Sequence, residues 1–314
     1  MNYLFLLNQV KAESFLNENS NKIFGDNYLI KIKKIKRDKT YNTEGSLNIL
    51  YNLVVDDKKR SIRVSTSTFL NKEHDYNIMK FFHLNSFNQK PFFTPEPIAY
   101  LQNEKILFYE NVQGKILADI LNDEDTNLDK IFNQCAKLIN KVHLLPLPNL
   151  PLFNPQYLFE DFKYELITKK IPQAKNLNLV IKKIKDSLLI NKAKCFCHGD
   201  FNPNNLLILA DSICLIDFGI TTIFYKEIDL ASFLVHLKLL LQKHPSRFNK
   251  YRKIFLDAYG DFDKQKLYLL IALIESRLLE ISIIFEDTKY DTNFIFECLN
   301  DDLKSANIGL ENES

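Results

Sequence analysis

Three polar side chains in one short stretch of the chain could carry out phosphoryl transfer. Asp200 ends the sequence His198-Gly199-Asp200, Asn205 follows five residues later, and Asp217 comes next in Ile-Asp-Phe-Gly. A carboxylate such as Asp200 can accept the proton of an incoming hydroxyl group. An amide oxygen and a carboxylate are hard ligands of the kind that Mg²⁺ prefers, together with phosphate and water oxygens. These residue types therefore indicate a proton acceptor beside a site for Mg²⁺.

The elements that must position these side chains are two short strands. Apolar runs at 206–209 and 213–216 flank a polar turn and predict a β-hairpin. If a three-residue loop is centred on Asp211, Asn205 and Asp217 lie directly opposite each other, with Cβ atoms about 4.5 to 5.5 Å apart. One cation could then contact both side chains. Ordinary turn residues are the alternative for each position alone, but turn chemistry does not require this order and framing.

In this region the chain resembles the superfamily of aminoglycoside phosphotransferases and choline kinases, which has the fold of the protein kinases. His198 to Asn205 match its catalytic loop, and Asp217 to Gly219 match its metal-binding Asp-Phe-Gly. Protein kinases carry Arg where Gly199 stands, so the small-molecule branch is the better match. The resemblance implies that Asp200 is the catalytic base, that Asn205 and Asp217 hold Mg²⁺, and that ATP is the phosphate donor.

Two upstream stretches resemble the nucleotide site of the same superfamily. Gly45 to Tyr51 is similar to the loop over the nucleotide, with Asn48 at the third position after the glycine. A plain hairpin turn explains these residues equally well. Arg63 occupies the place where kinases have the lysine that contacts the α and β phosphates, and a guanidinium can form a bidentate clamp there. A solvated cation on an edge strand is the alternative for Arg63.

A helix after this strand would supply the partner of Arg63. Asn71 could cap it, and apolar residues up to Phe82 keep helical spacing. Glu73 is the candidate partner and Asp75 is the second choice. A surface carboxylate in the first helical turn is the alternative for both.

The stretch from Lys105 to Gly114 resembles the connector between the two lobes of the superfamily. By position, the resemblance implies that the carbonyl of Glu110 and the amide of Val112 pair with adenine. Downstream of the site, Glu227-Ile-Asp229 resembles a helix start of the family. Asp229 is expected to cap that helix and to brace the catalytic loop, with simple capping as the alternative.

Glycine is rare in this chain, with seven among 314 residues, where about 7% is usual. Four of the seven fall on the proposed landmarks: Gly45, Gly114, Gly199 and Gly219. We expect these positions to need a positive φ angle or a close approach of the backbone.

Length and pattern predict an α+β chain of two lobes, and the resemblance implies that its two-lobed fold is protein-kinase-like. A small antiparallel β-sheet lobe over 1–111 would bind the nucleotide, and a larger, mainly helical lobe over 112–314 would carry catalysis and the substrate. Apolar spacing predicts long helices over 128–145, 248–259 and 267–285. Hydrophobic residues make up 46% of the chain, enough for a sizeable core.

Composition also excludes several classes of protein. The sequence contains no run of eighteen uncharged apolar residues, so no membrane span is predicted. Its net charge of +2 does not suggest a nucleic-acid partner. Five irregularly spaced cysteines indicate a reducing, cytoplasmic location. A zinc site is suggested by Cys195, Cys197, His198 and Cys214. However, Cys195 and Cys197 are two residues apart, which is closer than the usual spacing of zinc-binding cysteines. Core cysteine is therefore the preferred interpretation, because free cysteine is so often buried. The remaining histidines form no spaced ligand set.

The expected function is ATP-dependent phosphorylation of a hydroxyl group on a small molecule such as an amino sugar, a sugar, an amino alcohol or a homoserine-like compound. Residues 286–314 hold eight acidic and two basic residues, which favours an amine-bearing substrate. A solvated, partly frayed tail explains the same residues. The absence of Trp argues mildly against choline.

Two other functions are possible for a chain of this fold. A catalytically inactive nucleotide-binding regulatory protein of the same fold would have no chemical need for Asp200, Asn205 and Asp217 together. A protein kinase would need a peptide platform, and no recognisable Ala-Pro-Glu follows Gly219.

Overall fold

The computed structural model describes residues 3–37, 46–67, 72–123, 126–159, 162–189, 194–284 and 291–306. The chain divides into two compact units. The first consists of Met1–Ile116, Asn149–Pro151 and Leu206–Gly219, and the second of Leu117–Pro148, Leu152–Asn205 and Ile220–Ser314. The first unit thus includes the predicted hairpin. The predicted lobes, 1–111 and 112–314, assign this hairpin to the second lobe.

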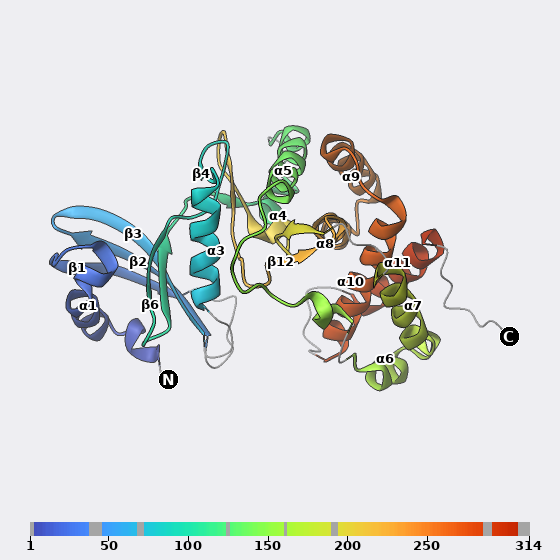
Figure 1. Ribbon diagram of the computed structural model, residues 1–314, viewed down its shortest axis with the longest axis horizontal. Coiled ribbons are helices and arrows are strands. Elements are labelled where there is room, and N and C mark those ends of the chain that lie inside the picture. The colour runs from blue at the N-terminus through green and yellow to red at the C-terminus, as the bar shows by residue number, and fades with distance from the viewer. Residues whose placement is uncertain are drawn as a thin grey trace. The chain divides into compact units, whose positions relative to one another are not determined.

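An antiparallel five-stranded sheet lies in the first unit, in the order β1-β2-β3-β7-β6. Figure 1 labels four of these strands, β1, β2, β3 and β6. Its strands are β1 (Ile30–Arg37), β2 (Ser46–Val55), β3 (Lys58–Ser67), β6 (Pro97–Leu101) and β7 (Ile106–Glu110). The short helices that precede it are η1 (Tyr3–Leu7), α1 (Gln9–Glu18) and α2 (Ser20–Phe24).

Side chains alternate between the two faces of β2 and β3. The side chains on one face, among them Ile49, Tyr51 and Val64, pack together with the N-terminal helices in the apolar core. Its opposite face carries polar side chains, among them Asn48 and Arg63. The alternation follows from the period of two along a strand.

A second sheet in the first unit holds the predicted hairpin. Its order is β4-β5-β11-β10-β8, with β11 parallel to β5 and the other neighbours antiparallel. The strands are β4 (Asn88–Gln89), β5 (Phe92–Phe93), β8 (Lys115–Ile116), β10 (Leu206–Ile208) and β11 (Ile213–Leu215). Helix α3 (Lys72–Leu84) precedes β4. The ring of Phe82 on α3 contacts that of Phe218, with centroids 5.1 Å apart.

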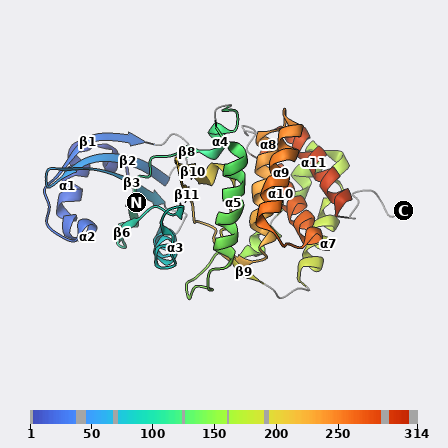
Figure 2. The same ribbon diagram turned by 90° about the horizontal axis from the view of Figure 1, so that it is seen from above.

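The second unit is mainly helical (Figures 1 and 2). Its α-helices are α4 (Leu117–Ile120), α5 (Leu128–His143), α6 (Tyr164–Lys170), α7 (Leu177–Leu189), α8 (Glu227–Leu240), α9 (Pro245–Tyr259), α10 (Lys264–Ile284) and α11 (Thr292–Ser305). It also has the 3₁₀ turns η2 (Pro155–Leu158), η3 (Pro172–Ala174) and η4 (Pro203–Asn205), and the antiparallel pair β9 (Cys195–Cys197) and β12 (Thr222–Phe224). Helix α10 packs against α6, α7, α8 and α11, and α5 packs against α9.

These elements confirm the predicted fold class, an α+β chain with an antiparallel N-terminal sheet and a helical C-terminal part. The helix predicted over 128–145 is α5, in which the regularly spaced apolar residues are buried: Leu128, Ile131, Phe132, Cys135, Leu138, Ile139 and Val142. In the part of the chain that the structure describes, no helix is long and apolar enough to cross a membrane.

The acidic C-terminal stretch differs from the frayed tail that was one interpretation of it. Residues Thr292–Ser305 form α11, whose Ile295 and Leu299 are buried. The Asp291 side chain accepts hydrogen bonds from the first turn of this helix. Apolar residues spaced three and four apart within the charged stretch explain why it packs on α10.

A buried carboxyl group lies where α8, α10 and α11 meet. Glu275 is fully buried, 3.6 Å from Lys238 Nζ, and Lys238 makes its shorter ion pair with Asp302, at 2.7 Å. Neither carboxyl oxygen of Glu275 has a hydrogen-bond partner among the described residues. Burial raises the pKa of Glu275 well above its ordinary value, and the Asp302 carboxylate adds to the increase. The uncharged form of Glu275 is therefore favoured beside the Lys238–Asp302 ion pair.

Replacing Glu275 by glutamine is expected to flatten the pH dependence of the unfolding free energy. The folded state holds the Glu275 proton more tightly than the unfolded state, because its pKa lies above the ordinary value of 4.5. Wild-type stability therefore falls as pH rises above that value, by up to about 1.4 kcal/mol per pH unit from this group. Urea unfolding from about pH 5 upward measures the slope. Glu297→Gln on the exposed face of α11 is the control. If the unfolding free energy of Glu275→Gln falls with pH as steeply as that of wild type, the raised pKa is not the cause of the slope.

Candidate active site

The loop predicted to be catalytic, His198 to Asn205, holds Asp200 and Asn205 in direct contact. Asn205 Nδ2 donates to Asp200 Oδ2 at 2.9 Å and to the Asp200 carbonyl at 2.8 Å. Asn202 Nδ2 donates to the other carboxylate oxygen, Oδ1, at 2.8 Å. Because both amide hydrogens of Asn205 are used on Asp200, its remaining polar atom is Oδ1, a hard acceptor. Sequence reasoning missed Asn202, although asparagine two residues from a polar group commonly bonds back to it.

A buried aspartate holds the backbone of this loop. The carboxylate of Asp229 accepts hydrogen bonds from the amides of His198, at 2.8 Å, and Gly199, at 2.7 Å. His143 Nε2 lies 3.0 Å from the same carboxylate. The structure thus confirms that Asp229 braces the catalytic loop. It does not cap α8, because the helix begins at Glu227 and Asp229 already lies in its first turn.

The loop also depends on the absence of a side chain at Gly199. Its φ angle is +85°, and a Cβ atom there would overlap the carbonyl oxygen of Ile220. This confirms the expectation from glycine usage at that position. The expectation is wrong at Gly219, where a Cβ would meet nothing closer than Asp217 Oδ1, at 3.7 Å. The positive φ of that segment falls on Asp217, at 66°. Gly45 lies outside the described residues.

The predicted hairpin is present, but its register differs from the predicted one. Leu206 pairs with Leu215, and Leu209 N donates to the Ser212 carbonyl at 2.9 Å. This hydrogen bond makes the turn one residue shorter than the loop centred on Asp211. Continuing the ladder would set Asn205 against Ile216, so the prediction that Asn205 and Asp217 are directly opposed residues is wrong. Asp217 instead follows β11 by two residues in a left-handed conformation, which changes the direction of its side chain.

Within the first unit, Asp217 lies near the first turns of α3. The carboxylate of Asp75 is buried on that helix. Burial raises the pKa of Asp75, the nearby charge of Asp217 adds to the increase, and Lys72 at 2.7 Å opposes it. His74 Nε2 lies 3.2 Å from the Phe218 carbonyl. The second-choice acid of the sequence analysis, Asp75, is therefore the α3 carboxylate beside the Asp-Phe-Gly segment.

Arg63 lies on β3, opposite Leu50 on one side and Tyr109 on the other. Its Nε donates to Asn111 Oδ1 at 3.1 Å, and Asn111 in turn donates to Ser61 Oγ, also at 3.1 Å. Sequence reasoning missed Asn111, because the residues are 48 positions apart and no local pattern links them.

The other side chains expected at the nucleotide have less direct support. Glu73 is near Tyr100, whose pKa is raised by burial and then by the Glu73 charge. The pairing of Glu73 with Arg63 stays a prediction. Asn48 lies within strand β2, opposite Ser65, and not in a loop. The residues that would cap α3 or begin the loop, Asn71 and Gly45, are outside the described residues.

The connector begins where β7 ends. Glu110 N donates to the Glu96 carbonyl at 2.9 Å, and Asn111 N donates to the Ser61 carbonyl at 3.3 Å. Among the described residues, the next amide, that of Val112, donates no hydrogen bond. The pairing of Glu110 and Val112 with adenine stays a prediction that this geometry allows. The connector returns to the sheet at β8, and Gly114 approaches β10 so closely that a Cβ would lie 3.1 Å from the Ile208 carbonyl.

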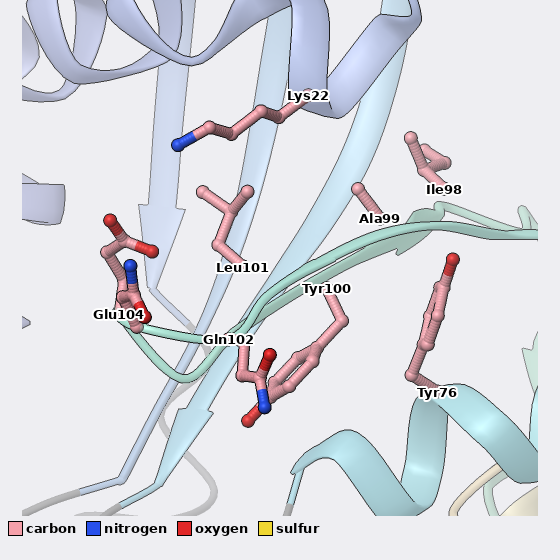
Figure 3. Close-up of a pocket in the computed structure, with 9 residues that line it drawn as sticks. Lys22, Tyr76, Ile98, Ala99, Tyr100, Leu101, Gln102 and Glu104 are labelled. Carbon is pink, nitrogen blue, oxygen red and sulfur yellow. The ribbon is translucent and has the colours of Figure 1, made fainter.

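A separate hollow of about 450 Å³ lies along β6 in the first unit (Figure 3). Tyr76 from α3 and Tyr100 from β6 stand on one side of it, and Lys22 stands on the other. The two tyrosine rings are stacked, with centroids 6.2 Å apart. None of the site residues predicted from the sequence lines this hollow.

Comparison with known proteins places these features in a family. Residues 65–270, more than half of the chain, match the sequence model of a family described as "Phosphotransferase enzyme family". A search of curated proteins finds no significant match.

Solved structures show a similar fold. Choline kinase LicA from Streptococcus pneumoniae is 14% identical, with a TM-score of 0.64 over 94% of this chain and 99% of that chain. Amicoumacin kinase hAmiN, solved with AMP-PNP and Ca²⁺, is 12% identical, with a TM-score of 0.62 over 95% of each chain. A variant of an aminoglycoside 2′-phosphotransferase in complex with GDP is 16% identical, with a TM-score of 0.59 over 93% and 98%.

Proposed function

The chain belongs to the phosphotransferase enzyme family, and we propose that it transfers the γ-phosphoryl group of ATP to a hydroxyl group of a small molecule. The observation that carries the proposal is the constrained carboxylate of Asp200. Asn202 and Asn205 hold its two oxygens, and Asp229 fixes the backbone before it. A base held in one orientation is what general-base catalysis on a bound hydroxyl requires.

The polar groups of the site fit Mg²⁺. Asn205 uses both amide hydrogens on Asp200, so Oδ1 is the atom that would bind a cation. The charge of Asp217 disfavours ionisation of the nearby Asp75 carboxyl group, and a bound cation would reduce this repulsion. Carbonyl and carboxylate oxygens are the ligands that Mg²⁺ prefers. Asn205 and Asp217 would hold the ion. When bound, Mg²⁺ would neutralise the negative charge that develops on the phosphate oxygens.

Asp200 acts as the base in the proposed reaction. Its carboxylate orients the acceptor hydroxyl and takes the hydroxyl proton. The acceptor oxygen forms a new bond to the γ-phosphorus, while the bond between that phosphorus and the oxygen of the departing ADP breaks. Asn202 and Asn205 keep the carboxylate from turning away during this step.

The first unit supplies the groups proposed for the nucleotide. Arg63 would clamp the α and β phosphates, and its hydrogen bond to Asn111 at 3.1 Å supports a fixed orientation of the guanidinium. The amide of Val112 would donate to adenine and the carbonyl of Glu110 would accept from it. Asn48 shares the polar face of the sheet with Arg63, and it is proposed to contact the nucleotide from β2.

The acceptor is proposed to be an amino sugar, a sugar or an amino alcohol. Two of the similar structures are named as kinases of small molecules, a choline kinase (LicA) and an amicoumacin kinase (hAmiN). The acidic excess of the C-terminal stretch favours an amine-bearing acceptor. Asp302 pairs with Lys238 and Asp291 caps α11, so these two carboxylates have structural partners.

A screen of acceptors tests the proposed function. The purified protein is incubated with Mg²⁺, with ATP or GTP, and with aminoglycosides, choline, ethanolamine, sugars or homoserine in turn. At least one acceptor is expected to produce ADP or GDP above the background and to gain the mass of one phosphoryl group. An inactive nucleotide-binding regulator would bind ATP and release no diphosphate with any acceptor. That outcome would count against the proposal.

A further inference from the structure

Three potential metal ligands meet behind the catalytic loop, within the second unit. A ring nitrogen of His143 and the sulfur atoms of Cys195 and Cys197 all lie within 4.8 Å of one another. His143 is the last residue of α5, and the two cysteines lie on the same face of β9. Helix α5 packs against β9, which brings residues more than fifty positions apart together. None of the proposed phosphoryl-transfer chemistry uses these three side chains.

The spacing of the two sulfur atoms suits a tetrahedral ion. Cys195 Sγ and Cys197 Sγ are 3.6 Å apart. Two Zn–S bonds of about 2.3 Å at the tetrahedral angle would separate the sulfurs by about 3.8 Å. The cysteines are free thiols, not a disulfide. A small adjustment of one side chain would therefore bring the two sulfur atoms to the separation that a tetrahedral zinc ion requires.

His143 has the neighbour that metal-binding histidines usually have. Its Nε2 lies 3.0 Å from the Asp229 carboxylate, whose oxygens also accept from the amides of His198 and Gly199. An ionised carboxylate only accepts hydrogen bonds, so Nε2 carries the hydrogen and Nδ1 carries the lone pair. A carboxylate on the far nitrogen of the ring orients a histidine ligand and increases its basicity. In the structure, Nδ1 lies 2.8 Å from the hydroxyl of Tyr259, which an ion would displace.

Charge and access both favour Zn²⁺. Two thiolates and a neutral imidazole carry two negative charges, so a divalent ion makes the buried group neutral. Cys197 is fully buried and the His143 side chain is 5% exposed, whereas Cys195 is only half-buried. Cys195 thus provides the path by which an ion reaches the other two ligands.

We propose that His143, Cys195 and Cys197 form a binding site for Zn²⁺. The site is distinct from the Mg²⁺ site of the phosphoryl-transfer reaction, because its donors are sulfur and nitrogen and not oxygen. It is joined to the catalytic loop twice: Cys197 directly precedes His198, and His143 shares the Asp229 carboxylate with the loop amides. The fourth ligand is water or the Tyr259 hydroxyl.

The corresponding prediction from the sequence named a different set. Cys195, Cys197, His198 and Cys214 were considered together, and core cysteine was preferred. Within the described residues, the cluster contains His143 and neither His198 nor Cys214. The sequence could not indicate His143, because the contact depends on how α5 packs on β9.

Cobalt binding to the reduced, full-length protein tests the site. Co²⁺ replaces Zn²⁺ in tetrahedral sites, and thiolate ligands give a near-ultraviolet charge-transfer band that oxygen ligands do not give. Wild type is expected to show this band and the visible bands of tetrahedral cobalt, and Zn²⁺ should displace both. Mg²⁺ in excess should leave the bands unchanged, since it does not compete for thiolates.

Two variants define the ligands. Cys195→Ser and His143→Gln are each expected to weaken Zn²⁺ binding about a hundredfold or more, because loss of an outer-shell partner alone costs about 10- to 100-fold. Cys298→Ser, which removes another free cysteine far from β9 in the sequence, is the matched control and should bind as wild type does. Thermal unfolding without metal shows whether each variant is folded.

Two results would overturn the proposal. One is a reduced, folded wild-type protein that gives no thiolate-to-cobalt band. The other is a band of equal strength in wild type and Cys195→Ser. Neither result depends on phosphoryl-transfer activity, so failure of this site and failure of the proposed function are distinguishable.

Discussion

Asp200→Ala is expected to lower the rate of acceptor phosphorylation by about 10² to 10⁴, the usual contribution of a positioned general base. The loss should appear in kcat, because the acceptor hydroxyl then has no group to take its proton. Binding of ATP should persist, since the groups proposed for the nucleotide lie in the first unit. Acceptor-dependent ADP release measures the rate, and calorimetric titration with a non-hydrolysable ATP analogue measures the binding.

Asp211→Ala is the matched control for this experiment. Asp211 lies in the turn of the β10–β11 hairpin, its side chain is 74% exposed, and its ion pair with Lys90 at 3.6 Å is exposed as well. Exposed pairs of this kind contribute at most about 1 kcal/mol. Activity should therefore stay at the wild-type level. Undiminished turnover in Asp200→Ala would disprove the role of Asp200 as base.

Gly199→Ala is expected to destabilise the protein by about 2 to 5 kcal/mol. This range adds the penalty for a left-handed alanine to that for forcing a methyl group into packed space. The methyl group would overlap the Ile220 carbonyl, so the backbone must move, and the amide that donates to Asp229 moves with it. Activity should be lost together with stability. Equilibrium unfolding in urea measures the change.

Gly25→Ala separates the two contributions. Gly25 has nearly the same φ angle, +81°, but a Cβ there would have no atom within 4 Å. It should therefore show only the conformational penalty, about 1 to 2 kcal/mol. Equal destabilisation by the two substitutions would mean that the close approach of Gly199 to Ile220 has no energetic consequence.

Local patterns in the sequence were sufficient for helices α5, α9 and α10 and for the position of the proposed catalytic loop. The apolar spacing of α5 predicted its buried face position by position, because a helix with one buried face must repeat every 3.6 residues. The order His-Gly-Asp followed by Asn identified a loop in which Asp200 and Asn205 do make contact. Both inferences depend only on residues close together in the chain.

The register of the hairpin could not be obtained in the same way. Ala210-Asp211-Ser212 is compatible with loops of two or three residues, and the choice depends on whether Leu209 and Ser212 pair. In the structure they do. A change of one residue in loop length moves every cross-strand partner by one position. Because apolar residues flank this turn on both strands, the local sequence does not favour one of the two registers over the other.

Contacts between distant elements were the other limit. The hydrogen bond of Arg63 to Asn111 and the approach of His143 to Cys195 and Cys197 are set by strand pairing and helix packing. The inward position of Asp75 depends on the rotation of α3 about its axis. Phe82 and Ile78 settle that rotation, because their burial turns Asp75 inward with them.

The grip of Asn202 and Asn205 on Asp200 has a consequence for how the protein responds to temperature. Immobilising one side chain has an entropic cost on the order of 1 kcal/mol. Here that cost lowers the free energy of unfolding and does not add to the activation free energy of each turnover. The activation entropy of the chemical step should consequently be less negative than it would be with a freely rotating carboxylate.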